Sequence, residues 1–161
     1  MVYDAGVIEK IVSGGQTGAD RAALDAAIAA GVPHGGWCPK NRAAEDGRIP
    51  DIYQLKETAE AFAEARTERN VIDSDGTVIF NRGALTGGSL RTEEFAREHG
   101  KPWLHVDLAA VTDEEAARVL GEFVAAKEIR VLNVAGSRAS AGEEIGRRTF
   151  AIVARMLGRE R

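Results

Sequence analysis

A short loop of glycines and polar residues is the part of this sequence best suited to chemistry. Residues 13–18 read SGGQTG and lie between an apolar run and an alanine-rich segment. Gly14 and Gly15 carry no Cβ atom, so their backbone can approach a ligand closely. Gly18 opens a predicted helix, and a helix N-terminus presents unpaired N–H groups with a partial positive charge. Asp20 follows in the first turn, where it could cap the helix or meet a hydroxyl group. The loop therefore predicts a site for phosphate or another anion.

Two further loops of this kind follow other predicted strands. Residues 81–89 end in TGGS, and residues 135–140 contain hydroxyl groups and Arg138, which could clamp an oxyanion through two parallel hydrogen bonds. The alternatives are simple turns, an N-cap by Ser89 and a surface arginine. The candidate ligand-binding residues of the three loops are Gly14, Gly15, Gln16, Thr17, Gly18, Asp20, Thr86, Gly87, Gly88, Ser89, Gly136, Ser137 and Arg138.

A polar stretch, residues 39–47, adds a fourth candidate segment. Lys40 and Arg42 could face phosphate groups of a ligand, and Asp46 could face a ribose or ring nitrogens. The alternative is a solvated surface loop. The histidines have no metal-ligand spacing, so no metal site is predicted. Cys38 could be a nucleophile, but a buried structural cysteine is the preferred interpretation.

Strands and helices alternate along the chain. Apolar and β-branched runs predict strands at 7–12, 32–38, 77–80, 103–106 and 129–134, and helical composition and capping signals predict helices at 19–30, 55–64, 90–99, 112–127 and 141–157. Thr112 and Glu115 have the spacing of a capping box. This alternation predicts a three-layer, Rossmann-like α/β fold with a mainly parallel sheet of about five strands. Ligands bind such sheets beyond the carboxyl ends of the strands, where the glycine-rich loops would meet.

The composition indicates one cytoplasmic domain spanning residues 1–161. That length suits a single domain, and no linker or repeat divides it. A net charge of −4 gives no basic surface for nucleic acid or anionic membranes. The single cysteine excludes a disulfide within the chain, and no apolar run is long enough for a membrane span. We therefore expect a small-molecule ligand, with neither nucleic acid nor membrane as a partner.

Several blocks together resemble the molybdenum carrier proteins, also described as molybdenum-cofactor carrier-like. The most specific are residues 13–20, SGGQTGAD, and residues 36–47, GWCPKNRAAEDG. The resemblance covers nearly the whole chain and continues through residues 53–55, 66–71, 74–77, 85–89 and 136–138. It implies a Rossmann-like fold allied to the lysine-decarboxylase-like group, whose members bind nucleotides or their derivatives. It also implies a homo-oligomer that binds the molybdenum cofactor (molybdopterin), a pterin carrying a phosphate, and that has recipient molybdoenzymes as partners.

The same group contains phosphoribohydrolases, which release a base from a nucleoside monophosphate. Their active loop reads G-G-x-G-T-x-x-E, and Gly87, Gly88 and Glu94 fit that frame. Leu90 and Arg91 replace the glycine and the threonine that follow the first variable position, so backbone freedom and a hydroxyl are missing where phosphate and ribose would lie. Three functions remain open: a cofactor carrier, a nucleotide hydrolase that uses Glu94 or Asp20 as its general acid or base, and a nucleotide-binding sensor.

Overall fold

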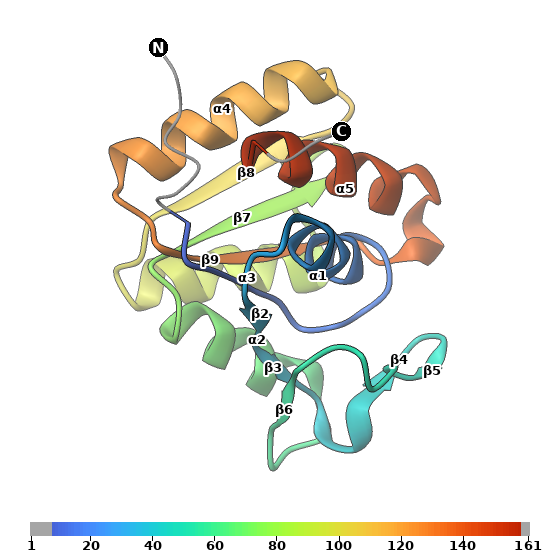
Figure 1. Ribbon diagram of the computed structural model, residues 1–161. Coiled ribbons are helices and arrows are strands. Elements are labelled where there is room, and N and C mark those ends of the chain that lie inside the picture. Colours follow the sequence, from blue (N-terminus) through green and yellow to red (C-terminus); the bar gives the residue numbers. More distant parts are fainter. Residues whose placement is uncertain (1–7, 159–161) are drawn as a thin grey trace.

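The computed structural model describes residues 8–158 and contains a five-stranded parallel sheet (Figure 1). The strand order is β2-β1-β9-β7-β8, so the last strand along the chain lies in the middle. The strands are β1 (Lys10–Val12), β2 (His34–Gly35), β7 (Gly76–Asn81), β8 (Trp103–Asp107) and β9 (Val131–Gly136). Every residue of β7 is buried, as expected for a central strand of a parallel sheet covered on both faces.

Helices cover both faces of this sheet (Figure 1). On one face, α5 packs against both α1 and α4; on the other, α2 packs against α3. The helices are α1 (Ala19–Ala30), α2 (Ala63–Ile72), α3 (Gly87–Glu98), α4 (Asp113–Ala126) and α5 (Glu144–Met156). The fold is therefore three-layered and Rossmann-like, and the predicted architecture is confirmed. Within residues 8–158, no helix is both long and apolar enough to span a bilayer.

The prediction of one strand at 32–38 is wrong, because the chain leaves the main sheet at Gly36. This glycine has a φ of 126°, and a Cβ atom there would lie 2.3 Å from the carbonyl oxygen of Ser13. The chain therefore turns after β2 and enters a small lobe. The lobe holds β3 (Trp37–Cys38) paired with β6 (Lys56–Glu57), a short 3₁₀ turn (Lys40–Arg42), and β4 (Ala43–Ala44) paired with β5 (Gly47–Arg48).

The helix predicted at 55–64 is also wrong, since that segment begins with β6 and α2 starts only at Ala63. Strand pairing overrides the local helical composition there, because the Thr58 amide donates to the Cys38 carbonyl and continues the β3–β6 ladder. The last predicted helix, 141–157, starts later than expected: a 3₁₀ turn (Ala139–Ala141) precedes α5. Of the first predicted strand, Val7 lies outside the described residues.

The capping box of α4 is confirmed. The Thr112 hydroxyl accepts a hydrogen bond from the Glu115 amide, and the Glu115 carboxylate accepts one from the Thr112 amide, both at 3.1 Å. We expect Thr112→Ala to lower the free energy of unfolding by about 1 kcal/mol, because it removes the partner of a helix N–H group. Urea titration measures this change. Glu114→Ala, in the same turn but outside the box, is the control; an equal loss in both variants would contradict the capping role.

Candidate functional site

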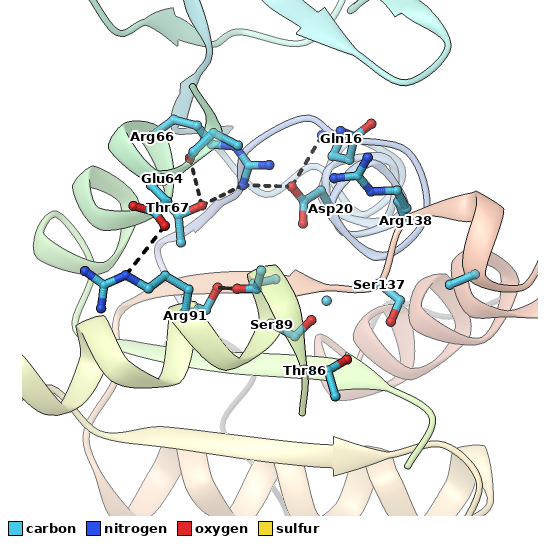
Figure 2. Close-up of a pocket in the computed structure, with 16 residues that line it drawn as sticks. Gln16, Asp20, Glu64, Arg66, Thr67, Thr86, Ser89, Arg91, Ser137 and Arg138 are labelled. Atoms are coloured by element: carbon cyan, nitrogen blue, oxygen red, sulfur yellow. Dashed lines mark hydrogen bonds and ion pairs between the residues drawn. The ribbon is translucent and has the colours of Figure 1, made fainter. Parts of the chain in front are cut away.

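A cavity of about 250 Å³ lies where β1, β7 and β9 end, between α2 and α3 (Figure 2). It is near the lower limit of ligand pockets, which span about 300–1,000 Å³. All three glycine-rich loops contribute to its wall, at the sheet edge where open parallel sheets bind ligands. Its lining consists of Gln16, Asp20, Ala63, Glu64, Arg66, Thr67, Thr86, Gly88, Ser89, Arg91, Thr92, Ala135, Gly136, Ser137, Arg138 and Ala141.

The first and third loops are packed tightly against each other. The Ala19 amide donates to the Ser137 carbonyl at 3.0 Å. Gly18 has a φ of 80°, and a Cβ atom there would lie 2.4 Å from that carbonyl oxygen. A side chain at position 18 would therefore separate the loops. The glycine serves loop packing, and it keeps Gln16 and Ser137 on the same cavity.

Glu45, in the small lobe, forms hydrogen bonds with both of these loops from outside the cavity. Its carboxylate accepts hydrogen bonds from the hydroxyl groups of Thr17 and Ser140 and from the Ser140 amide. The hydroxyl groups are the main reason that the pKa of Glu45 is lowered. Its own amide donates to the Gln16 side-chain oxygen at 2.9 Å. The Thr17 hydroxyl is thus occupied by a contact between loops.

The N-terminus of α3 forms another wall of the cavity. Thr86 has extended backbone before the first turn, and its carbonyl accepts hydrogen bonds from the amides of Ser89 and Leu90. Thr86, the N-cap residue, makes no capping hydrogen bond with its side chain. A Cβ atom at Gly88 would meet nothing within 4 Å, so the backbone here borders open space. The uncapped N-terminus therefore offers a ligand its N–H groups and a partial positive charge.

Charged side chains of both signs face the cavity (Figure 2). Arg66 on α2 lies 3.6 Å from the carboxylate of Asp20, which is almost fully buried. Arg91 on α3 lies 3.9 Å from Glu64 and is also paired with Glu94 and Glu98. The Arg138 guanidinium is exposed and makes no hydrogen bond within the part of the chain that the structure describes. Arg138 can therefore turn toward an anion without breaking a hydrogen bond, although its charge also acts on the Glu45 carboxylate.

Asp20 gives the protein a specific pH dependence. Burial raises its pKa above the ordinary value of 3.8, and Arg66 acts in the opposite direction. The folded state therefore binds the Asp20 proton more tightly than the unfolded state does. As the pH rises from 3.8 through the raised pKa, the contribution of Asp20 to the free energy of unfolding falls. We expect Asp20→Asn to gain stability relative to the wild type across that range. Urea titrations between about pH 3 and pH 8 measure the difference.

The exposed Glu60→Gln variant controls for the change of net charge in this comparison. A difference between Asp20→Asn and the wild type that does not vary with pH would contradict the raised pKa.

The structure does not bring every sequence-predicted residue to this cavity. Eight of them line it: Gln16, Asp20, Thr86, Gly88, Ser89, Gly136, Ser137 and Arg138. Gly14 lies just behind, in a small pocket that also contains Asp20 and Arg66. Gly15, Thr17, Gly18, Lys40, Arg42, Asp46 and Gly87 are not part of the lining.

Three of these residues have other contacts. A Cβ atom at Gly15 would lie 2.6 Å from the Leu55 side chain, so this glycine faces the small lobe. Asp46 pairs with Arg21 at 2.5 Å. The buried Arg42 side chain donates to backbone carbonyls of the lobe, those of Ile49, Pro50, Tyr53 and Leu55, and lies 3.8 Å from the Asp51 carboxylate.

Of the two carboxylates considered as a general acid or base, one lines the cavity and the other does not. Glu94 is exposed, pairs with Arg91 at 3.2 Å and does not line the cavity, whereas Asp20 does. Cys38 is fully buried among Leu24, Ile49 and Tyr53, away from the cavity. Among residues 8–158, no group of three or more His, Cys, Asp or Glu side chains could hold a metal ion.

Sequence reasoning missed the contribution of α2 and of two residues in α3, Arg91 and the buried Thr92. Glu64, Arg66 and Thr67 line the cavity without following a glycine-rich loop, and Arg91 and Thr92 line it just after the second loop. The signals for Arg66 and Thr67 were their place in a polar stretch before the third predicted strand and in a block of the family resemblance. Their position depends on α2 packing against α3, a contact between helices that local sequence patterns do not encode.

Fold and cavity together define a Rossmann-like α/β protein with a cavity at the carboxyl edge of its sheet. Residues 11–157 match the model of the circularly permutated YpsA SLOG family, and the chain belongs to that family. A crystal structure from Syntrophus aciditrophicus SB, named "Putative molybdenum carrier protein", is 50% identical; the alignment covers 94% of this chain and 96% of that one, with a TM-score of 0.92. The predicted relationship to molybdenum carriers is thereby confirmed. The comparison with curated proteins gave no match.

Proposed function

We propose that this protein binds a phosphate-bearing small molecule in the cavity between α2 and α3, and that the molecule is the molybdenum cofactor. The observation that carries the proposal is the uncapped N-terminus of α3 at the cavity wall, on the same cavity as the unbonded guanidinium of Arg138. A helix N-terminus and an arginine are the two protein features that most favour phosphate. The hydroxyl groups of Thr86, Ser89 and Ser137 supply further hydrogen bonds.

The name of the Syntrophus protein supports the choice of molybdenum cofactor over other phosphate-bearing ligands. In this proposal the phosphate lies at the α3 N-terminus and the pterin fills the cavity toward α2. Gln16, Asp20 and Glu64 would then meet the donors and acceptors of the pterin ring. The carrier is a cytoplasmic homo-oligomer that delivers its cofactor to recipient molybdoenzymes.

Calorimetric titration with molybdenum cofactor, and in parallel with a panel of nucleoside monophosphates, tests this function. We expect selective binding of the cofactor, which is recovered unaltered. At a ligand concentration of about 100 times Kd, binding should add about 2.7 kcal/mol to the free energy of unfolding. Size-exclusion chromatography of the same samples tests the homo-oligomer.

Selective binding of a nucleotide would contradict the carrier function and support the second candidate function, that of a nucleotide-binding protein or phosphoribohydrolase. Asp20 is the carboxylate that favours it, because burial holds its pKa above the ordinary value inside the cavity. Release of free base, abolished by Asp20→Asn and retained by Glu94→Gln, would identify the hydrolase. An intact nucleotide would identify the sensor.

A further inference from the structure

Arg66 is buried in a way that leaves part of its guanidinium without a partner. Its side chain is 12% exposed, and it lines both the main cavity and the small pocket behind it. One terminal nitrogen, Nη1, donates to the Thr67 hydroxyl at 3.2 Å and lies 3.6 Å from Asp20. The Nε–H group is buried and has no hydrogen-bond partner among the described residues. A buried donor left unpaired destabilises the free protein, and a ligand that accepts its hydrogen bond recovers that loss.

Gly14 provides the space in which this guanidinium lies. A Cβ atom at Gly14 would lie 2.5 Å from Nη1, 2.7 Å from Cζ and 2.8 Å from Nε of Arg66. All three nearest atoms belong to that one guanidinium group. The glycine is thus required for the position of Arg66, although the sequence pattern suggested that it approaches a ligand directly.

Asp20 holds the guanidinium from the side of α1 without saturating it. The separation of 3.6 Å exceeds hydrogen-bond distance, and the same carboxylate accepts a bond from the Gln16 amide at 3.3 Å. Arg66 therefore keeps donors of its planar guanidinium available at the cavity. Such a group binds a phosphate or another oxyanion through two parallel hydrogen bonds.

We infer that Arg66 binds an oxyanion of the ligand directly, from a position that Gly14 leaves open and Asp20 maintains. This inference rests on the proposed function, because it assumes that the cavity is the ligand site. The ligand then has an anionic group at the cavity floor, in addition to the anionic group expected at the N-terminus of α3.

The experiment measures binding of molybdenum cofactor, adenosine monophosphate and inorganic phosphate to the wild type and to Arg66→Ala, Arg66→Lys and Gly14→Ala. We expect each change at Arg66 to weaken binding of the preferred probe by about 10- to 100-fold, since lysine cannot form the bidentate contact. Gly14→Ala should weaken binding because it displaces the guanidinium. In the Arg66→Ala background, Gly14→Ala should have no further effect, since nothing remains to be displaced.

A direct readout follows ligand binding in the wild type itself. The Arg66 Nε–H resonance of the labelled wild type, assigned by its absence from Arg66→Lys, should shift on titration with the preferred probe. Arg118→Gln, which removes an α4 side chain paired with Glu122, is the control and should keep full affinity.

The outcomes separate the two proposals. Failure of the wild type to bind any probe would overturn the proposed function, and the role of Arg66 with it. Binding by the wild type that persists in both Arg66 variants, with an unmoved Nε–H resonance, would overturn the role of Arg66 alone.

Discussion

Replacing Arg42 by alanine should lower the free energy of unfolding by about 3 kcal/mol or more. Its guanidinium is buried and donates to four backbone carbonyls, at 2.7 Å for Pro50, 2.9 Å for Tyr53, 3.0 Å for Ile49 and 3.4 Å for Leu55. In the alanine variant these oxygens lose their partners inside the small lobe. Each lost bond to a charged donor is worth about 1.5–3 kcal/mol, although such effects do not add fully.

Urea titration of Arg42→Ala measures this loss, and Arg42→Lys shows how much of it charge alone restores. Lys40→Ala is the matched control, because Lys40 is a cationic residue of the same turn with an exposed side chain. We expect the control to change stability by less than about 0.5 kcal/mol. A stable Arg42→Ala variant with impaired ligand binding would instead favour the ligand contact expected from the sequence.

Replacing Gly88 by leucine should weaken ligand binding by about 10- to 100-fold, which corresponds to about 1–3 kcal/mol of overpacking. Gly88 lines the cavity, and a side chain there would meet no protein atom within 4 Å of its Cβ position. The added volume therefore occupies ligand space. The folded chain should tolerate the change, because leucine favours helix more than glycine does.

Calorimetry measures the affinity of Gly88→Leu, and urea titration measures its stability. Arg97→Leu, on the exposed surface of the same helix, adds a leucine away from the cavity and should keep the wild-type affinity. Unchanged affinity in Gly88→Leu would place the ligand away from the N-terminus of α3 and would contradict the proposed site.

The order of strands and helices could be predicted because each is encoded locally. Thr112 and Glu115 lie three residues apart, and their capping box formed as expected. The central strand at β7 is an apolar, β-branched run whose burial is complete. The helix predicted at 55–64 failed because Lys56 pairs with Trp37, a partner distant in sequence. Local composition cannot report such a pairing.

The candidate site could be predicted where its residues lie on loops that follow parallel strands. Gly88 and Ser89 line the cavity because a loop after a parallel strand must lie at that edge. Arg42 and Arg66 show the limit for side chains. Both are arginines in polar segments, yet one donates to backbone carbonyls of the lobe and the other faces the cavity. The difference depends on Gly14, which lies next to Arg66 only in the folded chain.

The central position of β9 affects how the protein must be made. Leu132 pairs with Ile11 on one side and with Gly76 on the other, so β9 joins two half-sheets that share no other strand. During synthesis, β1–β2 and β7–β8 emerge first and have unpaired edges until residues 131–136 leave the ribosome. Such long-range pairing slows folding. A chain stalled before β9 exposes edges to which another nascent chain can add a strand. We therefore expect the protein to be prone to aggregation until residues 131–136 have been synthesised.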